Sequence, residues 1–227
     1  LLLLLRGEFI AIFFLSIFLL IFLFKIKFKY VLAIILIAFI TSSPYLIRNI
    51  VLLNEISITK SFGYNLWKGN NNNSRVEGSE KINDILRSKI DEIPKNKYYG
   101  INFDKVFLEE AKKNIKSDPT KYLILYFEKF ISFLVVDINS SHPRYFNPLH
   151  FFPILLLSIT SLAGIAVSDK KSHKLNYLIL VFFLNIIIFS FFFILPRYKL
   201  VILPIQIIFT NVLIDYIRNK FFSSNEQ

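Results

Sequence analysis

Two cations flank a tyrosine in a short segment between two apolar runs, where residues 196–199 read Pro-Arg-Tyr-Lys. A guanidinium can hold a phosphate through two parallel hydrogen bonds, so Arg197 suits a phosphate group, with Tyr198 and Lys199 beside it. The same side chains could instead reach lipid headgroups, as long basic side chains do at the ends of membrane helices. From the residues alone, a phosphate site and a headgroup anchor are equally supported.

A further cation closes the motif Pro-Tyr-Leu-Ile-Arg-Asn at residues 44–49. Pro44 near the end of an apolar run predicts a kinked helix end, and Arg48 would then lie at the membrane boundary. These residues favour a headgroup contact for Arg48 over a role in substrate binding.

An aromatic and amide-rich stretch covers residues 62–71. The rings of Tyr64 and Trp67 could stack on a sugar at the surface, while Asn65 and Asn70 bond its hydroxyls. Anchoring of the two rings at a membrane interface explains them equally well. Glycines and asparagines continue to residue 78, so we expect an irregular loop over residues 61–78.

Several kinds of chemistry find no support in the composition. The chain of 227 residues has no cysteine, which excludes a thiol nucleophile and a thiolate metal site, and its three histidines form no metal-binding pair. The carboxylates form no distinctive pair either, so no metal ligand set is identifiable. The net charge of +11 would suit nucleic acid, but the cations lie largely between apolar runs, where membrane orientation signals are found.

The elements that must position these residues are predicted to be membrane helices. Hydrophobic residues make up 54% of the chain and the mean hydropathy is +0.52. A helix needs about 20 apolar residues to cross the hydrocarbon core. Five runs approach this length, which predicts an all-α integral membrane protein with about five transmembrane helices: residues 9–24, 30–47, 149–167, 177–195 and 200–217.

The basic links between these runs predict the topology. Residues 25–29, residues 168–174 and the cations after residue 217 would all lie on one side, which the positive-inside rule makes the cytoplasm. We therefore expect two transmembrane helices in residues 1–47, a partly helical outer (periplasmic) segment over residues 48–148, and three transmembrane helices with a short cytoplasmic tail in residues 149–227. The protein would be multi-pass in the cell's inner membrane.

Two helices are expected inside the outer segment. Asn102 can cap an amphipathic helix, and Asp118 with Pro119 can start another that runs to about residue 137. Because Glu128 and Lys129 would be costly at the bilayer centre, we predict that this second helix lies at the membrane interface and does not cross.

In this order, the features resemble the C-terminal half of the bacterial polytopic glycosyltransferases of family 39 and their GT-C relatives, which include protein O-mannosyltransferases and the lipid A aminoarabinose transferase. The resemblance covers almost the whole chain. It departs from the family at Lys199, where an arginine is frequent, and at Gly7, where a proline is usual. The matching stretches are residues 5–8, 44–49, 63–71 with Gly78, Asp118-Pro119 before Lys121-Tyr122, and 196–200 with Pro204.

The resemblance implies transfer of a sugar from a polyprenyl-phosphate donor to a glycan, lipid or protein acceptor at the outer face of the membrane. It implies that Arg197 first, and Arg48 second, stabilise the departing phosphate. The chain lacks methionine and opens inside an apolar stretch, so we expect a piece of a longer protein, inactive by itself, whose acidic catalytic base lies upstream of Leu1. Some GT-C enzymes use a divalent metal, and the resemblance does not decide that cofactor.

Two other classes of membrane protein compete with this interpretation. A transporter or flippase component would also have many spans and rim cations, but it should carry polar groups at the bilayer midplane, where this chain offers mainly Asn185. An O-antigen polymerase or ligase shares a multi-span fold with a large outer loop, and the linear motifs fit it less well.

Overall fold

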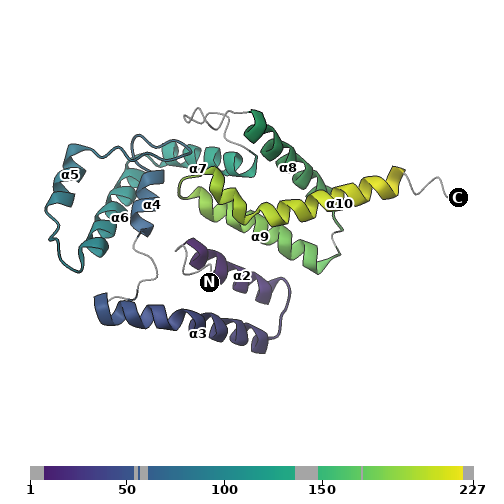
Figure 1. Cartoon of the computed structure of the whole chain (residues 1–227), viewed down its shortest axis with the longest axis horizontal. Helices are drawn as coiled ribbons and strands as arrows, with labels where there is room; N and C mark the ends of the chain where they lie inside the picture. Colours follow the sequence, from purple (N-terminus) through teal and green to yellow (C-terminus); the bar gives the residue numbers. More distant parts are fainter. Residues whose placement is uncertain (1–7, 54–55, 57–60, 136–147, 170, 222–227) are drawn as a thin grey trace. The chain divides into compact units, whose positions relative to one another are not determined.

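The computed structural model describes residues 8–53, 56, 61–135, 148–169 and 171–221, and every regular element in them is helical (Figure 1). The chain divides into two compact units, one of residues 1–123 with 191–193 and the other of residues 124–190 with 194–227. The first unit holds α2 (Glu8–Phe22), α3 (Phe28–Leu53), α4 (Phe62–Gly69), α5 (Asp84–Asp91), α6 (Tyr99–Ser117) and the start of α7 (Pro119–Leu134). The second holds the rest of α7, α8 (Pro148–Val167), α9 (His173–Ser190), the 3₁₀ helix η2 (Pro196–Val201) and α10 (Leu203–Phe221).

Each of the five predicted apolar runs lies largely on a helix, although residues 191–195 of the fourth run lie beyond the end of α9, and two of the helices in the described residues are long and apolar enough to cross a membrane. They are α3 and α9, while α2 and α8 contribute shorter apolar stretches. Only 11% of the apolar window of α3 is buried. A core helix of a soluble domain would be covered, so the exposed apolar surface of α3 is consistent with a helical membrane protein.

Helix α3 runs through Pro44 and ends at Leu53, six residues beyond the predicted end at residue 47. Pro44 has no N–H for the carbonyl of Ile40, but the Ser43 hydroxyl donates to that carbonyl at 2.9 Å. This bond satisfies the freed acceptor inside the helix, as apolar surroundings require. Arg48 is therefore an exposed residue within α3 and does not end the helix.

The α4–α6 lobe, defined as α4, α5, α6, the loop of residues 70–83 and residues 191–193, has its own apolar core. Trp67, Leu86, Phe107 and Ala111 are all at most 2% exposed in it. The prediction of an irregular loop over residues 61–78 is wrong for residues 62–69, which form α4. The glycines and asparagines of this segment indicated a loop, but the packing of Trp67 on α6 stabilises a helix there instead.

The two neighbouring helices of the lobe begin at polar caps. The Asp104 carboxylate of α6 accepts from the backbone N–H groups of Gly63 and Tyr64, both at 2.9 Å, and so caps α4 from another helix. Asn83 caps α5 by accepting from Leu86 N–H at 2.8 Å. Helix α6 itself begins at Tyr99, so the prediction that Asn102 caps it is wrong.

The start of α7 confirms the prediction from the pair Asp118-Pro119. The Asp118 carboxylate accepts from Lys121 N–H at 3.1 Å, and Pro119 is the first helical residue. The helix ends at Leu134, and residues 136 and 137 of the predicted run lie outside the described residues.

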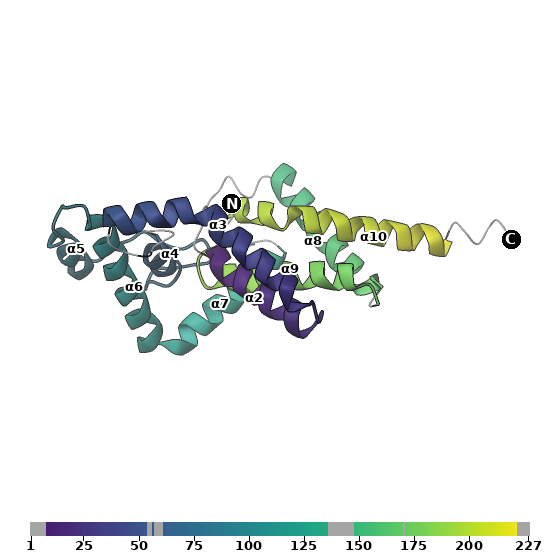
Figure 2. The same cartoon turned by 90° about the horizontal axis from the view of Figure 1, so that it is seen from below.

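In the second unit, α8 and α10 lie against each other (Figures 1 and 2). A Cβ at Gly164 would collide with the Phe209 carbonyl, so only glycine permits this approach. The hydroxyls of Thr160 and Thr210 join the same two helices at 3.0 Å. Close backbone approach at small residues with a polar bond beside it is typical of helix pairs in membranes.

Candidate functional site

The predicted short link at residues 196–199 is the first part of η2, a 3₁₀ helix in the second unit. Its turns close through Tyr198 N–H to the Leu195 carbonyl at 2.9 Å and Ile202 N–H to the Lys199 carbonyl at 3.0 Å. The segment is thus a hydrogen-bonded turn.

Arg197 and Tyr198 take opposite roles in this turn. Tyr198 is 7% exposed and its ring centroid lies 5.7 Å from that of Phe189 on α9. Arg197 is exposed, with the carbon of its guanidinium 5.5 Å from the Tyr198 ring centroid. A cation over an aromatic face is held by the ring quadrupole, so the buried tyrosine supports an outward-facing guanidinium.

Lys199 lies next in the turn and contacts the end of α7. Its ammonium donates to the carbonyl of Val135, which also accepts from the Ser158 hydroxyl of α8 at 3.1 Å. Gln206 of α10 reaches the same hydroxyl at 3.5 Å. A lysine at a helix C-terminus is favourable because the carbonyls there are partly negative. Lys199 thus joins η2 to α7.

The aromatic pair of the α4–α6 lobe is not the surface platform that the sequence predicts. Trp67 is 2% exposed, its ring centroid 4.6 Å from that of Phe107, so the prediction that its ring lies at the surface is wrong. Tyr64 is half-buried, 5.1 Å from Phe107 by ring centroids. The physical reason is that an amphipathic α4 has no other apolar face to set against α6.

The Asn70 side chain is hydrogen-bonded to backbone carbonyls at the end of α4. It is 5% exposed, and its amide nitrogen donates to the carbonyls of Leu66 and Phe191, each at 2.8 Å. A Cβ at the preceding Gly69 would collide with the backbone of Phe192. Asn65, also predicted to bind a hydroxyl, is half-buried on α4.

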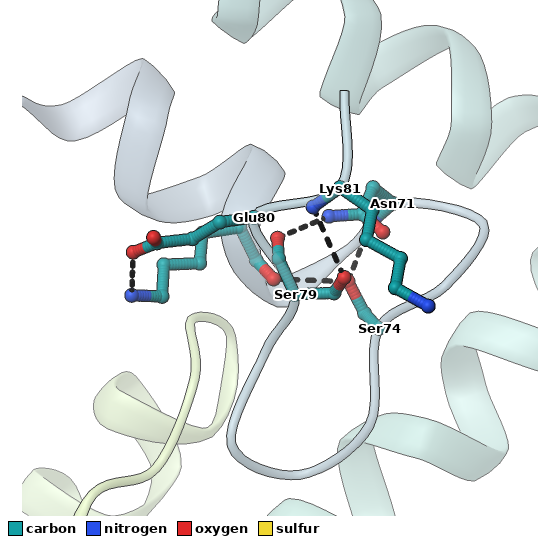
Figure 3. Close-up of polar contacts among 6 residues, drawn as sticks. Asn71, Ser74, Ser79, Glu80 and Lys81 are labelled. Carbon is teal, nitrogen blue, oxygen red and sulfur yellow. Dashed lines mark hydrogen bonds and ion pairs between the residues drawn. The ribbon is translucent and has the colours of Figure 1, made fainter. Parts of the chain in front are cut away.

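Figure 3 shows a polar network in the loop after α4 that sequence reasoning missed. Lys68 pairs with Glu80, the Asn71 amide donates to the Ser79 carbonyl at 2.6 Å, and the Ser74 hydroxyl donates to the Lys68 carbonyl at 2.9 Å. The Glu80 side chain is 61% exposed. No spacing rule joins residues 68 and 80, because only the fold of the loop brings them together.

The charges of this network are coupled to Tyr64. The hydrogen bond from Lys68 lowers the pKa of Glu80, so the carboxylate is ionised at neutral pH. Burial raises the pKa of Tyr64, and the nearby Glu80 charge raises it further. An ionised, exposed carboxylate beside a neutral phenol can accept hydrogen bonds from hydroxyl groups of a ligand.

Lys129, which the sequence analysis used only as a charge that is costly at the bilayer centre, is buried in the structure. It is 0% exposed, and burial lowers its pKa to about 7. It follows Tyr122 and Leu125 at helical spacing and precedes Phe133, all three of which are buried. That spacing was the available signal, because it places Lys129 on the covered face of α7.

The predicted site residues therefore fall in both units. Arg48, Tyr64, Asn65, Trp67 and Asn70 belong to the first, and Arg197, Tyr198 and Lys199 to the second. Of the motif at residues 5–8, residues 5–7 lie outside the described residues. Within the described ranges, no group of three His, Asp or Glu side chains could hold a metal ion.

Comparisons with protein-family models, with curated proteins and with solved structures found no match for this chain.

Proposed function

We propose that this chain is part of a membrane glycosyltransferase that moves a sugar from a polyprenyl-phosphate donor to a glycan, lipid or protein acceptor at the outer face of the cell's inner membrane. The observation that supports it best is the η2 turn. Tyr198 is buried and Lys199 donates to the Val135 carbonyl at the end of α7. Arg197, in contrast, is exposed and contacts the Tyr198 ring.

Such an arginine has a defined task in sugar transfer. When the sugar leaves its carrier, negative charge grows on the phosphate oxygens. The guanidinium of Arg197, which contacts the Tyr198 ring, could bind that charge through two parallel hydrogen bonds. Contacts that strengthen as the charge grows lower the barrier, so Arg197 would act chiefly on turnover.

The membrane setting supports the same proposal. A polyprenyl carrier is confined to a bilayer, and α3 and α9 are apolar enough to cross one. A multi-pass topology would place η2 at the outer rim. Arg48, exposed on α3, is the second candidate for contact with the phosphate.

Asn185 is the observation that favours a transporter or flippase component instead. Its amide oxygen is buried on α9 without a hydrogen-bond partner in the described part of the chain. A buried polar group inside a span is costly unless a ligand or partner satisfies it. Asn185→Leu should leave sugar transfer unchanged under the glycosyltransferase proposal, and it should abolish translocation of a fluorescent lipid-linked sugar under the transport alternative.

The direct test is substitution of Arg197 in the full-length protein, reconstituted with a radiolabelled polyprenyl-phosphate sugar. Arg197→Lys keeps the charge but loses the planar fork, and should already lower kcat. Arg197→Ala should lower kcat by roughly 10²–10³-fold, the usual effect of removing one donor to a developing oxyanion.

Arg218→Ala is the matched control, because the Arg218 side chain is 68% exposed on α10 and pairs with the exposed Asp215 at 3.1 Å. It should transfer sugar at the normal rate. A folded, inserted Arg197→Ala protein with unchanged kcat would reduce Arg197 to a headgroup anchor and remove the main support for the proposal.

A further inference from the structure

Four elements of the second unit are linked at one backbone carbonyl, that of Val135 at the end of α7. This carbonyl accepts from the Ser158 hydroxyl of α8 at 3.1 Å and from the Lys199 ammonium of η2. A carbonyl oxygen has two lone pairs, so the two donors occupy both. The Ser158 oxygen lies 3.5 Å from the amide nitrogen of Gln206 on α10. We call these four residues the Val135 junction.

The polar side chains of the junction are buried in apolar surroundings. Ser158 is 0% exposed and Gln206 is 2% exposed, and the buried neighbours of Gln206 at helical spacing, Ile202 and Phe209, are apolar. A buried hydroxyl or amide is costly unless it is hydrogen-bonded. Here each contact crosses from one element to another, and a satisfied polar network of this kind fixes the relative position of the elements that it joins.

Ser158 belongs to a closely packed helix pair. The Thr160 hydroxyl bonds to α10 at 3.0 Å, and Gly164 permits close approach of the two backbones. From this pair, the Ser158 hydroxyl holds the carbonyl to which Lys199 is bonded, and Lys199 lies two residues after Arg197 in the η2 turn. Removal of the hydroxyl would break the bond between α8 and the carbonyl that holds Lys199.

We propose that Ser158 is a positioning residue for Arg197. Its bond to the Val135 carbonyl fixes the attachment point of Lys199, and through Lys199 it fixes the turn that presents Arg197 to the departing phosphate. This inference rests on the proposed function and extends it, because it assigns a role in turnover to a fully buried hydroxyl. Because the charge on the phosphate grows in the transition state, displacement of Arg197 should affect turnover more than donor binding.

The first measurement does not depend on sugar transfer. Leu200, 66% exposed on η2, is replaced by cysteine in the full-length protein as its single cysteine, and a nitroxide is attached there. In nanodiscs, Ser158→Ala should increase the mobility of this label, seen as narrower lines in its electron paramagnetic resonance spectrum. Ser161→Ala is the matched control, because Ser161 is also 0% exposed but donates at 2.9 Å within its own helix. It should leave the spectrum unchanged.

The second measurement is the turnover of a radiolabelled polyprenyl-phosphate sugar. Ser158→Ala should lower kcat about fivefold, the equilibrium factor of one ordinary hydrogen bond, and change KM for the donor less than twofold. In an Arg197→Ala background, the same substitution should have no further effect, because two residues that act as a unit are not additive. A general loss of folding would lower kcat by the same factor in both backgrounds. Ser161→Ala should keep the normal kcat.

Each result decides one claim. An unchanged label spectrum in Ser158→Ala, or an equal loss of kcat with and without Arg197, would overturn the positioning role of Ser158 and leave the proposed function standing. A normal kcat in Arg197→Ala would instead overturn the proposed function, and the role of Ser158 in turnover would fail with it.

Discussion

Lys129 shows how strongly burial can change the pKa of one side chain. Burial lowers its pKa from 10.5 to about 7, so the folded protein gives up its proton far more readily than the unfolded chain. Between pH 7 and 10.5 the unfolded chain holds more protons, and stability must rise with pH across that window. Below pH 7 both states are protonated and the full cost of the buried charge remains.

Replacement of this lysine should therefore have a pH-dependent effect. In Lys129→Met the midpoint of thermal unfolding should rise relative to the wild type, with the largest gain near pH 6 and a smaller gain near pH 9. Circular dichroism of the purified full-length protein in detergent measures both. Lys112→Met, at an exposed lysine of α6, is the control and should show no such trend. A difference independent of pH would mean that Lys129 keeps an ordinary pKa.

The cap that Asp104 forms on α4 predicts how a substitution changes the stability of the α4–α6 lobe. Its carboxylate satisfies two N–H groups at the start of α4, so Asp104→Ala should destabilise the lobe by about 1–2 kcal/mol. Trp67 is the chain's one tryptophan and is buried there, so its fluorescence reports on this lobe. Urea unfolding followed by that signal gives the value. Glu109→Ala, exposed on the same helix, should unfold as the wild type does.

At the scale of elements, the sequence predicted best where local signals act alone. Asp118 and Pro119 began α7 as expected, because a cap and an N1 proline work within one turn. The apolar runs lie largely on helices, as their length and composition predict. Helix α4 was missed because its glycines argue for a loop. The apolar surface that buries Trp67 comes from residues much later in the chain, Leu86, Phe107 and Ala111.

The outward face of α7 carries a test of the predicted membrane-interface position. One face is apolar and exposed, with Leu123, Ile124, Phe127 and Ile131 all more than half exposed. Because the chain has no cysteine, a nitroxide can be attached at a single introduced cysteine. Labels at residues 127 and 131 should collide with oxygen more than with a water-soluble nickel complex, as expected at the acyl boundary. The reverse order at both positions would place this face in water.

At the scale of the whole molecule, the basic links predict which segments lie outside. Single cysteines at Asn73 and Lys112 should react with an impermeant maleimide in intact cells, and those at Lys27 and Lys171 should not. All four residues are exposed, whereas the buried Asn70 would be a poor reporter. Labelling at residue 27 without labelling at residue 73 would invert the topology and place Arg197 on the wrong side of the membrane.

The α4–α6 lobe also imposes an order on biosynthesis. The end of α4 is closed by residues 191–193, through the bond from Asn70 to the Phe191 carbonyl, which spans 121 residues, and through the contact of Lys68 with the Phe193 ring. At about 5–20 residues per second, the ribosome needs roughly 6–24 s to make that intervening chain. During this interval the end of α4 lacks its contacts with residues 191–193. Proteases and chaperones would therefore meet an incomplete lobe whenever translation stalls before residue 191, and the polypeptide can commit to its final stability only after α9 has been synthesised.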